Sequence, residues 1–185
     1  SAYFGDLDWA VSAFHGTHRS PQLLPELVNS KIRPHYRQTT QLSFDAVYVW
    51  ESWLLKFEGL NRHLSGKDHQ AVTGGGEYSF VGILETEQDL GFIIEGAWHS
   101  EKDRESTFAS EVMTGLRWVL NDVQGTEILG GVIVDWEKSS KLFSLEASRR
   151  LGDEFKLELE GRWFADVDSN DSLYAFRRDG HLKLQ

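Results

Sequence analysis

The feature that most constrains this chain is an alternation of apolar and polar side chains that persists from Thr39 onward. Between residues 155 and 163, for example, Phe, Leu, Leu, Gly and Trp alternate with Lys, Glu, Glu and Arg. Successive side chains of a β-strand point to opposite faces, so this segment has one apolar and one charged face. On a helix, the same four charges would be scattered around the cylinder. The pattern therefore predicts strands.

The alternation recurs in ten segments, and we expect each of them to be a strand. The segments are 6–18, 42–51, 53–58, 77–82, 89–99, 108–121, 127–136, 143–150, 155–163 and 181–185. Several sustain the pattern for about 9–13 residues, which suits the ~9–11 residues of a strand that crosses a bilayer at a tilt. Strands of soluble proteins are nearer ~5–6 residues long.

The connections between these segments are of two kinds, and the two kinds alternate along the chain. The short connections are 51–52, 85–88, 121–125 and 151–154. The longer or more charged connections are 19–38, 64–70, 100–107, 137–141 and 166–178. An antiparallel meander would gather the short turns at one end and the long loops at the other, as in outer-membrane β-barrels. The last strand would then run toward the short, periplasmic turns.

Composition narrows the classes of function. The 185 residues include 29 acidic and 19 basic residues, for a net charge of −10, and no cysteine. The acidic balance argues against nucleic acid as a partner, because phosphate binding needs clustered Lys and Arg. The absence of cysteine excludes disulfides, thiolate zinc sites and a cysteine nucleophile. A mean hydropathy of −0.41 argues against membrane-spanning helices, but the alternating strands of a transmembrane barrel also have a low mean value.

Aromatic residues are concentrated near the ends of the predicted strands. Rings at these positions would form the two interfacial girdles of a transmembrane barrel. The alternative is a hydrophobic core that contains tryptophan. The predicted girdle consists of Trp50, Trp53, Trp98, Trp118, Trp136 and Trp163.

The polar faces carry charges of both signs. Inside a small barrel such groups must pair across strands, because an unpaired buried charge is costly, whereas in a pore water solvates them. In a soluble sandwich the same face would be the outside of the protein. We predict an internal charge lattice that tunes permeation or plugs the lumen, formed by Glu95, Glu111, Arg117, Glu146, Arg150, Glu158, Glu160 and Arg162.

Three stretches near the C-terminus, 143–153, 156–160 and 172–179, resemble the C-terminal part of uncharacterised Gram-negative outer-membrane β-barrel proteins. The stretches 115–124 and 5–12 fit the same likeness. The resemblance implies a barrel in the outer membrane, with lipid, lipopolysaccharide and the barrel-assembly machinery as partners, and it implies no activity. Members of this family usually end in an aromatic residue that the insertion machinery reads, whereas this chain ends in Gln185.

We therefore expect an all-β fold, an antiparallel up-and-down transmembrane β-barrel, with residues 1–185 as a single domain. Ten strands either close by themselves or belong to a larger barrel with strands outside residues 1–185. The expected function is a passive pore, a transport channel for small solutes or a structural barrel. No spacing of His or Ser predicts a metal or hydrolase site, so we expect no enzyme, cofactor, metal or nucleic-acid partner. The alternative is a soluble β-barrel or sandwich that binds an apolar ligand.

Overall fold

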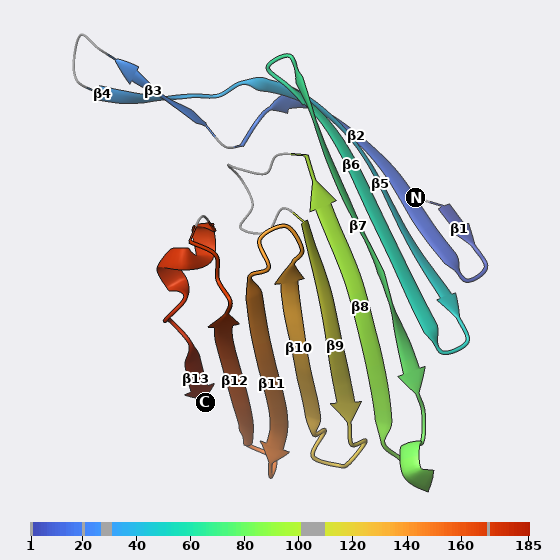
Figure 1. The fold of residues 1–185 in the computed structure, drawn as a ribbon. Coiled ribbons are helices and arrows are strands. Elements are labelled where there is room, and N and C mark those ends of the chain that lie inside the picture. Colours follow the sequence, from blue (N-terminus) through green and yellow to red (C-terminus); the bar gives the residue numbers. More distant parts are fainter. Residues whose placement is uncertain (1, 20, 27–30, 101–109, 170) are drawn as a thin grey trace.

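A computed structural model describes residues 2–19, 21–26, 31–100, 110–169 and 171–185, and these residues form an all-β protein. One antiparallel sheet of 11 strands dominates it, with the order β1, β2 and then β5 to β13 (Figure 1). The strands of this sheet are β1 (Ala2–Phe4), β2 (Leu7–Thr17), β5 (Gln38–Trp50), β6 (Trp53–Leu64), β7 (Lys67–Phe80), β8 (Asp89–His99), β9 (Ser110–Val119), β10 (Glu127–Asp135), β11 (Lys141–Leu151), β12 (Phe155–Ala165) and β13 (His181–Leu184). A separate hairpin comprises β3 (Gln22–Glu26) and β4 (Lys31–His35), and two short 3₁₀-helices are η1 (Ile83–Glu85) and η2 (Ser172–Phe176).

The ten predicted strands are all present, as β2 and β5 to β13. The sequence analysis missed the short strand β1 and the β3–β4 hairpin, which lies within the predicted loop 19–38. It also placed the start of one strand at Glu77, whereas β7 begins at Lys67 and runs through three consecutive glycines. The start of the segment predicted at 108–121 lies outside the described residues.

Those glycines allow a close approach of β7 to its neighbour β8. A Cβ atom on Gly75 would lie 2.3 Å from the carbonyl oxygen of Ile94 and 2.7 Å from the Cα atom of Glu95. Both are backbone atoms, so no side-chain rotation could relieve the clash. Glycine at this point of a strand therefore permits two backbones to come together.

Successive strands of the sheet are antiparallel, so their connections alternate between two ends, as predicted. The turns that include residues 51–52, 81–88, 120–126 and 152–154 lie at one end, which we call the short-turn end (Figure 1). The opposite end, the long-loop end, carries the β3–β4 hairpin and η2. One predicted long loop, 64–70, is wrong: β6 and β7 are joined by Ser65 and Gly66, whose φ angles of 54° and 76° suit a tight hairpin turn. The predicted loop 100–107 lies outside the described residues except for Ser100.

The sheet is not closed. Strands β1 and β13 form its two edges, and no pairing joins them among the described residues (Figure 1). The all-β, antiparallel, up-and-down architecture is thus confirmed, while a closed barrel is not shown. No helix in the described part of the chain is long and apolar enough to cross a membrane.

The described residues contain almost no hydrophobic core. Their only buried hydrophobic residues are Leu64 and Leu173. Each strand contacts mainly the strands beside it in the sheet, and in the described part of the chain no second sheet packs on either face. The hydrogen-bonded ladder and side-chain contacts along the two faces therefore hold this fold together.

The close approach at Gly75 predicts that Gly75→Ala destabilises the sheet by about 1–3 kcal/mol, the usual cost of overpacking. Gly130→Ala is the matched control, because its Cβ would make only an ordinary contact of 3.8 Å with Leu145. Replacing glycine there should be neutral or stabilising by up to ~1 kcal/mol. Chemical denaturation followed by tryptophan fluorescence measures both, and equal effects of the two substitutions would contradict this account.

Candidate functional site

The register of the sheet assigns every strand residue to one of two faces, because directly opposed residues of neighbouring strands share a face. One row, for instance, joins Leu7, Tyr48, Leu55 and Gly76 and continues to Ile94. We call this side the apolar face and the other the charged face. Besides tryptophans, the large exposed members of the apolar face are Val11, Leu42, Phe44, Tyr48, Leu55, Phe57, Val72, Phe80, Phe92, Ile94, Leu116, Phe143, Leu151, Phe155, Leu157, Leu182 and Leu184.

The apolar face is open along the whole width of the sheet. Val11 near one edge is 53% exposed, Ile94 in the middle 46% and Leu182 at the other edge 64%. Within the described strands, Asp68, Lys141 and Arg149 are the only Asp, Glu, Lys or Arg residues at positions of this face, and each lies near a strand end. The centre of the face thus carries no charge.

All six predicted girdle tryptophans lie at or near strand ends, and none is packed in a core. Five are on the apolar face, and Trp136 directly follows β10. Trp50, Trp53 and Trp118 lie at the short-turn end, and Trp98, Trp136 and Trp163 lie toward the long-loop end. Their exposed fractions range from 38% to 54%. The prediction omitted Trp9, which lies on the same face near the short-turn end.

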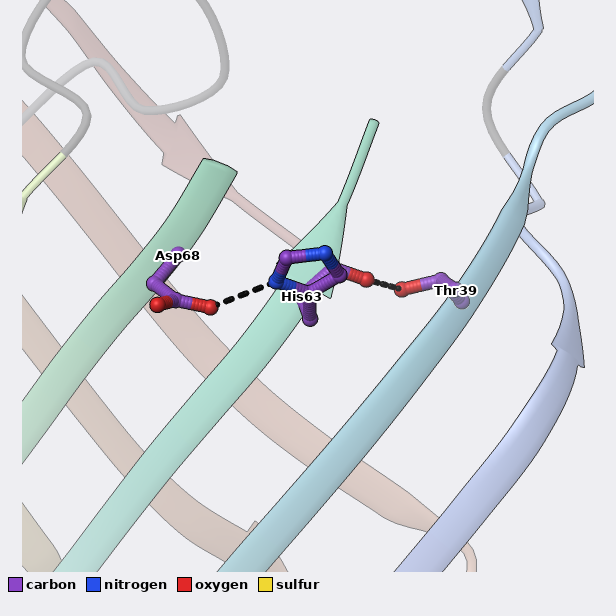
Figure 2. A network of polar contacts seen from close by, with 3 residues as sticks. All are labelled: Thr39, His63 and Asp68. Carbon is purple, nitrogen blue, oxygen red and sulfur yellow. Dashed lines mark hydrogen bonds and ion pairs between the residues drawn. The ribbon is translucent and has the colours of Figure 1, made fainter. Parts of the chain in front are cut away.

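At the long-loop end the apolar face gives way to polar side chains. His15, Thr40, His63 and Asp68 stand in one row across β2, β5, β6 and β7, and we call this row the polar collar. His15 Nδ1 is 2.9 Å from the Thr40 hydroxyl, and His63 Nδ1 is 2.7 Å from an Asp68 carboxylate oxygen. Figure 2 shows the second contact, together with the Thr39 hydroxyl that donates to the His63 carbonyl at 3.0 Å. The collar marks where the apolar face of these strands becomes polar.

At the short-turn end, Asp122 fixes the turn between β9 and β10. Its carboxylate accepts hydrogen bonds from the backbone N–H and the hydroxyl of Thr126, each 2.7 Å long. These bonds, with a smaller contribution from Arg149 at 3.8 Å, lower the pKa of Asp122 below its ordinary value. The carboxylate therefore stays charged and keeps the turn closed.

The eight residues of the predicted charge lattice all lie on the charged face, but they do not form one site. Glu146, Glu158, Glu160 and Arg162 line a trough of about 370 Å³ on β10 to β13. Glu95, Glu111 and Arg117 lie on β8 and β9, and Arg150 is near the short-turn end of β11. Other charged residues of the trough, which the prediction omitted, are Glu127, Lys156 and Lys183.

The trough holds two short ion pairs, both within β12. Lys156 Nζ lies 2.6 Å from Glu158 Oε1, and an Arg162 Nη2 atom lies 3.0 Å from Glu160 Oε1. Each pair joins residues two apart on one strand, whereas the sequence analysis expected pairs across strands. Among the residues that the structure describes, Glu95, Glu111, Glu146 and Arg150 form no ion pair.

One ion pair on the charged face joins strands that are not neighbours in the sheet. Arg117 on β9 donates to Glu77 on β7 above the intervening strand β8. The bridge passes over Gly91, where an added Cβ would lie 2.7 Å from a Glu77 carboxylate oxygen. The side chains of Glu77 and Arg117 are 15% and 38% exposed. The predicted lattice included Arg117 but not Glu77, because their proximity depends on the register of β7, β8 and β9.

The charged face offers no catalytic arrangement in the described strands. Ser144 and His181 share a register row, but Arg162 of β12 stands between them. The described residues contain no group of three or more His, Asp or Glu that could hold a metal ion.

Comparisons with family models, with curated proteins and with solved structures find no match to this chain. The functional interpretation therefore depends on the geometry of the two faces.

The half-buried bridge predicts that Arg117→Leu costs about 1–2 kcal/mol of stability, because Glu77 is left without its partner. The double variant with Glu77→Leu should recover most of this loss, and Gly91→Ala should reproduce it by displacing the carboxylate. Lys156→Leu, which breaks an exposed pair, should change stability by less than about 0.5 kcal/mol. Urea titrations of these variants and of Glu77→Leu alone measure the differences, and additive losses for Arg117 and Glu77 would refute the bridge.

Proposed function

We propose that this chain is an integral outer-membrane β-barrel protein of a Gram-negative bacterium that acts as a passive pore. In this proposal the apolar face contacts the acyl chains of the lipid, and the charged face lines an aqueous lumen. The observation that carries it is the apolar face itself, exposed over the width of the sheet and free of charge at its centre. Soluble monomers rarely expose contiguous apolar patches beyond a few hundred Å².

The height of the apolar face supports a bilayer. On strand β11, the charged residues Lys141 and Arg149 mark the two ends of the apolar face and lie eight residues apart. This separation corresponds to roughly 26 Å along a strand at ~3.3 Å per residue. At a tilt of about 40° the band would be about 20 Å tall, close to the ~25 Å apolar band of outer-membrane barrels.

The ends of the band also suit a membrane interface. Six tryptophans fall into two groups near these ends, and indole rings favour the headgroup level. The Trp118 indole N–H donates to Gln88 Oε1 at 2.9 Å, so its polar edge turns toward the short-turn end. The polar collar and the ion pair of Lys141 with Asp166, 2.6 Å long, would face outer-leaflet headgroups. Lipid, lipopolysaccharide and the assembly machinery are the partners that this placement implies.

The charged face supports a pore rather than an enzyme. Its long rows of charged and hydroxyl side chains include an open trough and no nucleophile–base pair in the described strands. Acidic residues outnumber basic ones on this face, so a lumen lined by it would favour cations. The acidic positions are Asp8, Asp45, Glu58, Glu77, Asp89, Glu95, Glu111, Glu127, Asp135, Glu146, Glu158 and Glu160, against Lys56, Arg62, Lys67, Arg117, Arg150, Lys156, Arg162 and Lys183.

The soluble alternative gains no support from the described residues. A sandwich buries its apolar side chains between two sheets, whereas here a single sheet leaves its apolar face uncovered. A ligand that covered this whole face would have to be as wide as the sheet. Lipid meets that requirement.

An arginine in the middle of the apolar face should oppose membrane insertion. We expect Val132→Arg to make folding into phosphatidylcholine vesicles less favourable by about 2–4 kcal/mol, which is the cost of an arginine near the bilayer midplane. Ser144→Arg is the matched control, because it lies on the charged face of the adjoining strand β11. A wild-type protein that stays monodisperse in plain buffer, or equal costs on both faces, would contradict the proposal.

Conductance in planar bilayers tests the pore itself. With a salt gradient, the wild-type protein should give a reversal potential of the sign expected for cation preference. Glu146→Gln with Glu160→Gln should move that potential toward zero, because two negative charges leave the trough. Asp153→Asn in the short turn between β11 and β12 serves as the control and should change it little. A membrane-inserted protein without conductance would indicate a structural or plugged barrel.

A further inference from the structure

The β3–β4 hairpin lies outside the main sheet, and one of its two faces is apolar. Leu23 pairs with Pro34 and Pro25 pairs with Ile32, so these four residues share a face. Leu23 is 63% exposed and Ile32 is 67% exposed. A two-stranded hairpin is marginally stable at best in water, so a surface that covers this apolar face would stabilise it.

The other face of the hairpin is basic. Lys31, Arg33 and His35 alternate with the apolar residues of β4, and all three are exposed. The chain as a whole has a net charge of −10, yet residues 9–44 contain four Lys or Arg residues and a single acidic residue, Glu26. The hairpin therefore belongs to a basic segment of an acidic protein.

The apolar face of the hairpin is in phase with the apolar face of the sheet. His18 donates to the Arg37 carbonyl at 2.8 Å, so the pairing of β2 with β5 extends to Arg37. Only Tyr36, which is 53% exposed, separates Arg37 from β4. Alternation along an extended chain then gives Ile32 and Tyr36 the same parity as the apolar-face residues of β5. The hairpin therefore continues the side of the sheet that would face lipid, and not the side that would face the lumen.

The position of the hairpin suits the surface of a membrane. The polar collar, which includes His15 and Thr40, lies between the apolar face of the sheet and the hairpin. At the long-loop end the hairpin turns aside from the line of β2 and β5 (Figure 1). It thus begins at the level that the proposed function assigns to lipid headgroups, and it can lie along that layer.

We propose that the β3–β4 hairpin is an interfacial anchor that binds the surface of an anionic lipid bilayer. In this inference, which rests on the proposed membrane location, Leu23, Ile32 and Tyr36 reach the acyl boundary, and Lys31 and Arg33 lie beside lipid phosphates. Amphipathic segments with Lys and Arg on their polar face bind membranes in this way, and the long stems of these side chains let their charges reach the headgroups.

Both faces of the hairpin enter the choice of occupant. A soluble acidic partner would match the basic face but leave the apolar face in water. A neutral lipid surface would cover the apolar face but offer no net charge to the basic one. An anionic lipid surface satisfies both faces at once.

Spin labels on the two faces test this arrangement in the full chain, which has no cysteine of its own. Pro34→Cys carries a label on the apolar face, and Gln22→Cys, opposite His35, carries one on the basic face. Each protein is placed in nanodiscs of phosphatidylcholine, with or without phosphatidylglycerol, and collisions with oxygen and with a water-soluble nickel chelate are compared. With phosphatidylglycerol, the label at position 34 should favour oxygen, whereas the label at position 22 should stay accessible to the chelate. High salt should weaken the contact, because it screens exposed charges.

Substitutions separate the basic face from net charge. Lys31→Gln with Arg33→Gln should lower the ratio of lipid-bound to free hairpin roughly 30-fold, the effect of two basic residues near an anionic surface. Lys138→Gln with Arg178→Gln removes the same charge from other loops at the long-loop end and should have little effect. Ile32→Ser should also weaken the contact, because it removes apolar area from the lipid. An equal loss in the control variant would overturn the inference.

The remaining outcomes also overturn the inference. Equal lipid contact at position 34 in the two kinds of disc would refute the role of anionic headgroups. A label shielded from both oxygen and the chelate would place the apolar face in the lumen or against a second copy of the chain. In either case, quenching of the sheet tryptophans by brominated lipid would leave the membrane proposal intact, and absence of quenching would refute both proposals.

Discussion

The structure depends on the requirement that backbone N–H and C=O groups find partners. With almost no buried hydrophobic side chains, the antiparallel ladder from β1 to β13 holds the strands in place and sets the register. That register sorts apolar and charged side chains onto opposite faces along the whole sheet. In hydrocarbon the same requirement would become strict, because no water replaces a missing backbone partner.

The sequence predicted the strands well because a period of two is a local property. Segments such as 89–99 and 155–163 place their side chains on two faces whatever their neighbours do, and the structure confirms both as strands. The eight lattice charges lie on the charged face because the alternation fixes the face of each residue. The six tryptophans lie near strand ends because the predicted segments end close to them. Whether they form a girdle and line a lumen stays a prediction.

The remaining features depend on contacts between strands. The β3–β4 hairpin escaped prediction because Pro25 and Pro34 lie within its short strands, where proline argues against a strand. The bridge from Glu77 to Arg117 requires the register of β7, β8 and β9, which no single segment encodes. Likewise, the ion pairs of the trough follow from side-chain conformations along β12.

The tight turn of Ser65 and Gly66 has a mechanical consequence. Strands β6 and β7 continue past the polar collar before they turn, and both are hydrogen-bonded along this extension through Leu64 and Lys67. Only this residue pair and the two-residue turn lie beyond the collar, so in the proposed orientation the hairpin would end close to the lipid headgroups. A peptide epitope spliced between Ser65 and Gly66 would then lie on the long-loop side of the sheet and leave the strand pairs intact.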